Sequence, residues 1–190
     1  MNKMTSPSKS RMWIGIAVAS TAIALCGWTA ANWERLRPYD WKIIGSQDAQ
    51  FRIAFPRNPT ASQENTTASD GSTFVSNKLT SSPAHGVTYA LAWWENPSQN
   101  DKSTDELFAD FRDCYIKIFH GNIVEEKAVN VEGYPAKDTL VFAPNGLVVA
   151  NRVIRVGPRL YSLWVLDSTA GHLDITNTKN FFGSLSLHRT

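Results

Sequence analysis

The sequence predicts an α+β fold in which an antiparallel β-sheet has helices on both faces (an α/β/α sandwich), preceded by an N-terminal apolar helix. Three observations predict it. Apolar residues alternate with polar ones over several short runs, as in strands. Residues 103–121 instead have apolar residues at helical spacing. Two runs, Val87 to Glu95 and Leu147 to Val156, are apolar on both sides, which is typical of strands in a sheet covered on both faces.

The chain begins with a basic segment, residues 1–12, followed by an uncharged apolar run, residues 13–31. Lys3, Lys9 and Arg11 precede the run, and no acidic residue does. We expect 1–12 to be a cytoplasmic n-region and 13–31 to be a transmembrane anchor or a signal peptide. Either reading places the rest of the chain outside the cytoplasm, in the periplasm or at the cell surface.

The processing of this run is left open by its residues. Trp13 and Trp28 stand near its two ends, where indole rings prefer the membrane interface, and this favours an uncleaved anchor. The small residues 29–31 also suit a signal peptidase, and a chain cut before Asn32 would be secreted. Cys26 is a poor candidate for lipid attachment, because the residue before it is large.

One domain is expected at residues 41–190, after a polar and aromatic linker at 32–40 in which Pro38 prevents a regular helix. The formal net charge of the whole chain is +2, and removing the three cations of residues 1–31 leaves about −1 for the exported part. This balance argues against nucleic-acid binding, which requires a basic surface. With Cys114 as its one cysteine, the domain cannot form an internal disulfide.

The first part of the domain reads as strands joined by a loop. Phe51 to Phe55 alternates like a half-buried strand and is ended by Pro56. Asn58 to Ser72 has almost nothing apolar to bury, so we expect a long mobile loop. Phe74 to Leu79 mixes apolar and polar residues, as an edge strand does.

A helix follows, and its start is marked by Ser103 and Glu106, which form a capping box. Gly121 is expected to close it. Its apolar stripe comprises Leu107, Phe108, Phe111, Cys114, Tyr115, Ile118 and Phe119. A second, weaker helix is predicted at about 172–182, with Gly183 at its end.

Between the two helices, turns at 133–135, 144–146 and 157–158 separate four strands of an antiparallel meander. The strands are expected at Ile123 to Val131, Lys137 to Ala143, Leu147 to Val156 and Arg159 to Leu166. After the second helix, Leu185 and Leu187 can enter the sheet.

The order of these segments resembles the PsbP and Mog-like superfamily, including its small exported bacterial members. The segments are FRIAFPRNP, TYALAWWEN, a capped helix ending in FHG, VEGYPAKD, ANRVIRVGPRLYSLWV and NTKNFFGSLSL. The turn at 133–135 and the hairpin at 157–161 carry most of the resemblance, which covers residues 41–187. It implies an α/β/α sandwich of the kind that usually acts as an extracytoplasmic binding or assembly factor, and it does not imply an enzyme. No photosystem-binding or Ran-binding motif can be mapped onto this chain.

No arrangement of His, Cys, Asp, Glu or Ser has the spacing of a metal site or of a nucleophile with its base. We therefore predict no catalytic, cofactor-binding or metal-binding residue and no cofactor. Cys114 is expected in the core, His120 as a helix cap, and Asp110 and Asp113 on a solvated helix face. Arg152 falls on an apolar face, where it either pairs with an acid or reaches out from under the cover.

Two classes of function remain. The first is a membrane-tethered extracytoplasmic binding or assembly module without catalytic activity, which contacts the membrane through its N-terminal helix and an unknown protein or surface partner outside. The alternative is a carrier of a small ligand or lipid that uses a cleft between sheet and helix. The aromatic residues available for such a cleft are Tyr89, Trp93, Trp94, Tyr161 and Trp164.

Strand directions place the 58–72 loop, residues 96–102 and the turns at 133–135 and 157–158 along one rim of the sandwich. Loops on a rigid scaffold are the usual place for recognition. The predicted partner-binding residues are Asn58, Glu64, Asp70, Asn96, Asp101, Tyr134 and Arg159. The competing interpretation is that long polar loops are merely tolerated insertions.

Overall fold

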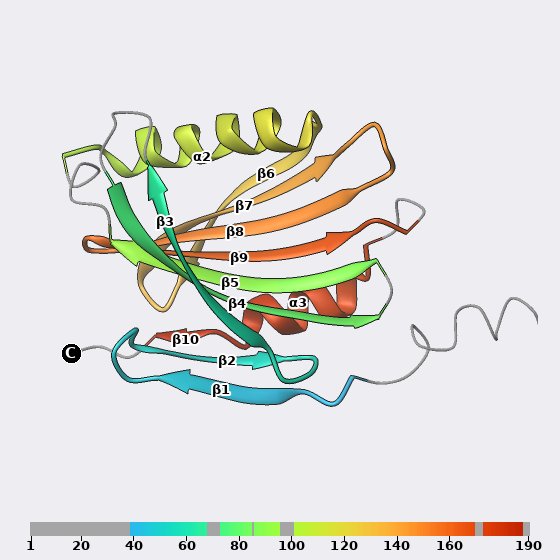
Figure 1. Ribbon diagram of the computed structural model, residues 1–190. Helices are drawn as coiled ribbons and strands as arrows, with labels where there is room; N and C mark the ends of the chain where they lie inside the picture. The colour runs from blue at the N-terminus through green and yellow to red at the C-terminus, as the bar shows by residue number, and fades with distance from the viewer. Residues whose placement is uncertain (1–38, 68–72, 85, 96–100, 170–172, 188–190) are drawn as a thin grey trace, which may run out of the picture. The chain divides into compact units, whose positions relative to one another are not determined.

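The computed structural model describes residues 39–67, 73–84, 86–95, 101–169 and 173–187 (Figure 1). The chain divides into two units, Met1–Pro38 and Tyr39–Thr190. The expected n-region and apolar helix lie outside the described residues, and so does the linker up to Pro38. No helix within the described ranges is both long enough and apolar enough to cross a membrane.

Seven antiparallel strands form a large sheet in the order β3-β4-β5-β9-β8-β7-β6 (Figure 1). They are β3 (Thr60–Thr67), β4 (Thr73–Ala84), β5 (Val87–Glu95), β6 (Asn122–Val131), β7 (Tyr134–Phe142), β8 (Val148–Val156) and β9 (Arg159–Asp167). The predicted meander is confirmed, because β6, β7, β8 and β9 each pair with the next. Strand β5 then pairs with β9 along its whole length and joins the two halves of the sheet.

A tight turn fixes the register of the β6–β7 hairpin. Glu132 and Gly133 have positive φ values of 52° and 95°. Two successive residues with positive φ are the geometry of the type I′ turn, whose twist matches that of a hairpin. The Gly133 amide also donates to Asn130 Oδ1 at 2.8 Å. Val131 therefore pairs directly with Tyr134.

The central strands are covered on both faces, as their sequences predict. Strand β5 lies between β4 and β9, and β8 lies between β7 and β9. Along β5, Tyr89 and Leu91 are buried in one core cluster, whereas Trp94 is buried in the cluster on the opposite face.

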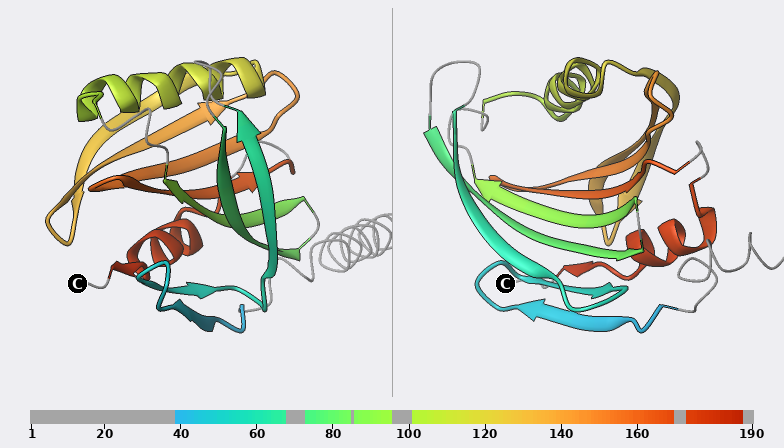
Figure 2. Two further views of the ribbon diagram at one scale, coloured as in Figure 1. Left: turned by 60° about the vertical axis from the view of Figure 1, so that its left-hand side comes forward. Right: turned by 45° about the vertical axis from the view of Figure 1, so that its right-hand side comes forward.

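A second, three-stranded sheet lies against the large one. It has the order β1-β2-β10, formed by β1 (Lys42–Ser46), β2 (Phe51–Phe55) and β10 (Ser186–Leu187). Helix α3 (Ile175–Gly183) precedes β10 and packs beside it (Figure 2). The Phe181 ring is fully buried and meets Phe55 and Tyr89 edge-on, with centroids 5.2 and 5.3 Å apart. These rings join helix α3, the small sheet and the large sheet in one core.

The predicted α/β/α sandwich with helices on both faces is therefore wrong. Helix α2 (Thr104–Phe119) covers one face of the large sheet, but the small sheet together with α3 covers the other, and the fold is mainly antiparallel β (Figure 2). The small sheet can cover this face because β2 alternates, with Phe51, Ile53 and Phe55 fully buried on one side. Leu187 enters this small sheet opposite Phe51, rather than the large one.

The mobile loop expected at Asn58 to Ser72 is also wrong, because most of it is strand β3. This strand pairs with β4 from Thr60 opposite Thr80 to Thr67 opposite Thr73. Strand pairing satisfies backbone groups and needs no apolar side chains, so a polar sequence can form an edge. Strand β4, which the sequence predicts at the edge, lies between β3 and β5.

Helix α2 confirms its predicted start. The Glu106 amide donates to Ser103 Oγ at 3.2 Å, and the Ser103 amide donates to Glu106 Oε2 at 2.9 Å. The Ser103 hydroxyl also donates to Glu106 Oε2, at 2.8 Å, and this bond together with that from the Ser103 amide lowers the pKa of Glu106. At the other end His120 is the C-cap, with a left-handed φ of 49°. Position 121 needs glycine for space and not for a positive φ, since a Cβ there would lie 2.6 Å from a methyl carbon of Val141.

The prediction that Cys114 is buried in the core is wrong, because its side chain is exposed. The helix contacts the sheet through Phe108, Phe111 and Tyr115. Adjacent helical residues point about 100° apart, so the buried Tyr115 turns its neighbour Cys114 out of the contact. Partial burial still raises the pKa of the Cys114 thiol.

Candidate functional site: a groove between helix α3 and the sheet

Two of the predicted partner-binding residues, Tyr134 and Arg159, lie at the edge where β5 ends and β9 begins. Arg159 donates twice to Glu95 Oε1, from Nη2 at 2.6 Å and from Nε at 2.9 Å. Its Nη1 donates to the Asp48 carbonyl at 3.1 Å. Tyr134 helps to line a shallow hollow at this edge with Pro135, Arg155, Gly157 and Pro158.

Of the other predicted residues that the structure describes, Asp101 lies near the same edge, because the carbonyl of the next residue, Lys102, accepts from Arg155 Nη1 at 2.7 Å. Glu64 is instead exposed in strand β3 opposite Ser76. Asn58 precedes β3 at the end that pairs with the middle of β4, away from the hairpin tip. Asp70 and Asn96 lie outside the described residues. Of the predicted rim, the structure thus places Asp101, Tyr134 and Arg159 near a common edge.

Arg152 pairs with an acid, which answers the question that its sequence position raised. It lies opposite Asp138 in the β7–β8 register. Its Nε and Nη2 donate to the two oxygens of Asp138 at 2.6 and 2.7 Å, the two-point geometry of a strong ion pair. The guanidinium also lies 5.0 Å from the ring centroid of Phe182, whose carbonyl accepts from Nη1 at 3.4 Å. The pair thus links α3 to the large sheet.

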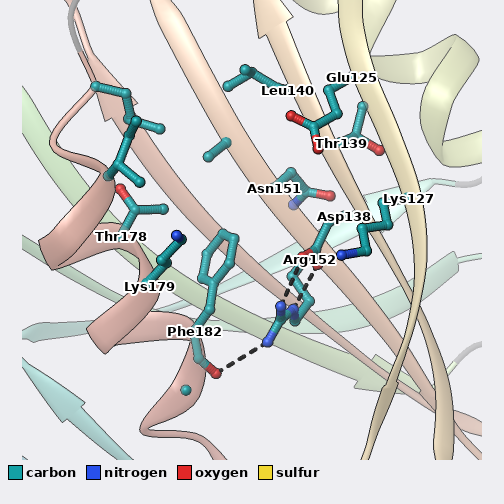
Figure 3. Close-up of a pocket in the computed structure, with 14 residues that line it drawn as sticks. Glu125, Lys127, Asp138, Thr139, Leu140, Asn151, Arg152, Thr178, Lys179 and Phe182 are labelled. Atoms are coloured by element: carbon teal, nitrogen blue, oxygen red, sulfur yellow. Dashed lines mark hydrogen bonds and ion pairs between the residues drawn. The ribbon is translucent and has the colours of Figure 1, made fainter.

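A groove of about 550 Å³ lies beside this ion pair, between α3 and strands β6, β7 and β8 (Figure 3). On the sheet side its apolar surface comes from Leu140 and Ala150. On the helix side it comes from Leu173, Ile175 and Phe182. Ile175 is 63% exposed, so the mouth of the groove presents an apolar side chain to solvent.

Charged side chains line one part of the groove. Lys179 extends from helix α3 and Lys127 from strand β6, on opposite walls, with Arg152 and Asp138 between them (Figure 3). Within the described part of the chain, neither lysine amine makes a hydrogen bond or ion pair. Because Asp138 is neutralised by Arg152, the two lysines leave this part of the groove positive. The exposed Glu125, which lies opposite Leu140 in the β6–β7 register, adds one negative charge beside the apolar wall.

The opposite face of the sheet holds a buried polar cluster centred on Ser162. Its Oγ accepts from Asn151 Nδ2 at 2.9 Å and from Trp164 Nε1, and it shares a hydrogen bond of 3.2 Å with the Tyr115 hydroxyl. Burial raises the pKa of Tyr115. The cluster is enclosed between α2 and the sheet, so its role is to hold the helix in place.

The aromatic residues expected to line a cleft lie elsewhere. Tyr89 and Tyr161 are buried beneath the small sheet, and Tyr161 donates its hydroxyl to the Ala49 carbonyl at 2.6 Å. Trp94 packs between Phe74 and Phe111 on the other face. The groove is instead lined by other apolar residues and by polar and charged side chains, none of which was predicted as a binding residue.

Metal binding has no visible basis in the part of the chain that the structure describes. No three His, Cys, Asp or Glu side chains there are grouped so that they could hold an ion.

Comparison with known proteins gives a fold and no sequence relative. No family model matches the chain, and no curated protein matches it. The structure is similar to the solution structure of cyanobacterial PsbP (CyanoP) from Synechocystis sp. PCC 6803, with a TM-score of 0.51 and 8% identity. The match covers 80% of this chain and 95% of CyanoP. The fold is PsbP-like. The resemblance read from the sequence is thus confirmed for the fold.

Two further solved structures match less well. A protein of unknown function from Pseudomonas aeruginosa, PA94, has a TM-score of 0.39 and 14% identity, over 69% of this chain and 85% of PA94. A protein from Bacteroides thetaiotaomicron VPI-5482 also has a TM-score of 0.39, with 10% identity, over 78% of this chain and 48% of the other.

Proposed function

We propose that the protein is a membrane-tethered extracytoplasmic binding module without catalytic activity, and that it binds through the groove between α3 and the sheet. The groove is the observation that carries the proposal. Its volume of about 550 Å³ falls within the roughly 300–1,000 Å³ of ligand sites. Its walls combine apolar side chains with a few charged ones, which is the usual composition of such sites.

The tether in this proposal is the apolar run at residues 13–31. Three cations precede it, and this asymmetry favours an orientation with the domain outside the cytoplasm. The segments shared with the PsbP and Mog-like superfamily and the PsbP-like fold both support membership of that superfamily, and with it a binding or assembly role.

The geometry favours a small ligand in the groove over a partner held by loops at the rim. Arg159, one of the predicted residues near this edge, already donates to Glu95 and to Asp48. A second candidate function, docking of a partner protein at this edge, rests on the shallow hollow beside Tyr134 and Pro158.

The tether is tested by fractionation and protease treatment. We expect the full chain to remain with membranes after an alkaline carbonate wash, and its domain to be digested by protease added outside. A soluble product that begins at Asn32 would contradict the anchor and would support the secreted form.

The groove is tested by native mass spectrometry of the full chain released from membranes. We expect a bound mass in the wild type and in Ile116→Asp, and its loss in Ile175→Asp. The two isoleucines are matched because both are exposed helix residues, but Ile175 lies at the groove and Ile116 lies on α2. A bound mass that survives Ile175→Asp but not Ile116→Asp, or no bound mass in any form, would overturn the groove as the binding site.

A further inference from the structure

We propose that the groove binds a single-chain anionic amphiphile, with its carboxylate or phosphate head between Lys127 and Lys179 and its acyl chain along Leu140, Ala150 and Ile175. This inference rests on the proposed function and names the class of ligand. It follows from the separation of charged and apolar surface along the groove.

The head is placed by the two lysines. They extend from opposite walls, and neither amine is paired within the described ranges (Figure 3). Between them, the partly buried Arg152 donates to both oxygens of Asp138. An anion between the lysines would therefore gain two cationic partners without breaking an existing pair. Since both lysines are exposed, they can reach it without desolvating a buried charge.

Strand register sets the direction of the ligand's acyl chain in the groove. Lys127 lies opposite Asp138 in the β6–β7 register. Beyond Asp138 along β7, the same face of the strand presents Leu140 and then Phe142. Phe142 is 40% exposed and follows Leu140 on this face of the strand, beyond the residues that line the groove. From Asp138 to Phe142 a strand advances about 13 Å. The groove thus has a positive part followed by apolar side chains, in the order in which a fatty acid presents its head and chain, with the exposed Glu125 at the outer β6 edge opposite Leu140.

A peptide strand fits this site less well than an amphiphile. A peptide would extend the sheet at β6, the outer strand on that side. Three successive charges, Glu125, Glu126 and Lys127, and a register shift between Ile123 and Glu125 protect this edge against strand pairing. A flexible chain with one charged head needs no strand edge.

The test is photolabelling of the full chain in phospholipid nanodiscs with a diazirine analogue of dodecanoate. We expect the labelled peptides to come from residues 138–152 and 173–183. Replacing both lysines, as Lys127→Gln with Lys179→Gln, should reduce labelling about tenfold, which corresponds to the loss of two exposed ion pairs. Lys117→Gln is the matched control, because Lys117 is an exposed lysine on helix α2, and it should leave labelling unchanged.

Competition separates the head from the chain. Unlabelled dodecanoate and dodecyl phosphate should displace the probe, whereas dodecanol should not. Octanoate should compete less well, by up to about fourfold for each missing methylene that is fully buried. If the carboxylate alone competes, the ligand is a fatty acid, and if the phosphate competes better, it is a phosphorylated lipid.

Labelling that is unchanged in the double lysine variant, or equal competition by dodecanol, would overturn the proposal. So would labelling spread over α2 as well as α3. These outcomes are separable from failure of the proposed function, since a different bound mass that is lost in Ile175→Asp would keep the groove as the binding site and reject the amphiphile.

Discussion

The two faces of the large sheet are covered to different extents, and the candidate site lies where cover is incomplete. On one face, the 16-residue helix α2 encloses the cluster around Ser162, which is fully buried. On the other face, the nine-residue helix α3 and the small sheet leave the groove along β6 and β7. The difference teaches that a groove can arise from a short covering element, without any residue motif.

The burial of side chains on the two faces of β7 and β8 shows this difference directly. Val141 and Val149 point towards α2 and are fully buried. Leu140, beside Val141 in the chain, points to the other face and is only partly buried. The same strand is therefore core on one side and groove wall on the other.

The largest effect is expected where the small sheet, α3 and the large sheet meet. Phe181→Ala should destabilise the domain by about 3–5 kcal/mol, because it leaves a cavity between Phe55 and Tyr89. Ile175→Ala, on the same helix but exposed, should change stability by less than about 0.5 kcal/mol. Denaturant unfolding of both variants measures this, and equal effects would mean that α3 is not anchored by Phe181.

A smaller effect is expected at the ion pair that borders the groove. Asp138→Ala should cost about 1–3 kcal/mol, since it leaves the largely buried guanidinium of Arg152 without its carboxylate. Replacing both partners, as Asp138→Leu with Arg152→Met, should recover much of the loss because no charge is then left unpaired. Thermal unfolding of the single and double variants checks this, and a double variant as unstable as the single one contradicts the account.

The face covered by α2 is probed by Tyr115→Phe. Ser162 accepts from Asn151 and Trp164, so its own proton is available for the Tyr115 oxygen. Removing that oxygen leaves the proton unpaired in the core, at a cost of about 1–2 kcal/mol. Unchanged unfolding free energy would show that the cluster does not hold α2.

Cys114→Ser should alter stability by less than about 0.5 kcal/mol, because the thiol is exposed. The same substitution in the core would cost more, since it would bury a hydroxyl without a partner. Denaturant unfolding therefore decides whether α2 is oriented with Cys114 exposed and Tyr115 against the sheet.

The smallest effect is expected at the start of α2 and depends on pH. The pKa of Glu106 is lowered in the folded state by its hydrogen bonds to Ser103. The ionised carboxylate therefore stabilises the fold at pH values above its usual pKa of 4.5. This contribution is lost as the pH falls from about 4.5 through the lowered folded-state value. Glu106→Gln should lack this loss in a series of thermal melts, and identical pH profiles would argue against the capping box.

Local features of the fold could be predicted from the sequence. The capping box needs only Ser103 and Glu106, and the β6–β7 turn needs Gly133 and its neighbours, so both follow from short stretches. Strands β5 and β8 were placed inside the sheet because apolar residues occupy both of their faces. In each case the deciding interactions lie within one element or between adjacent ones.

The layer arrangement and the groove depend on contacts between distant segments. Strand β2 pairs with β10, which follows it by more than 130 positions in the chain, so no local pattern reveals the small sheet. Lys127 and Lys179 read as ordinary exposed lysines until β6 and α3 are placed together. Arg152 was conspicuous as a charge on an apolar face, but its partner Asp138 is known only from the β7–β8 register.

The most direct test of the groove as the binding site is site-specific crosslinking in cells, with a photoreactive amino acid placed at Ile175 or at Ile116 of the full chain. Both positions are exposed on helices, but only Ile175 lines the groove. The account predicts an adduct from position 175, and none from position 116. Adducts of equal yield from both positions, or from 116 alone, would contradict it.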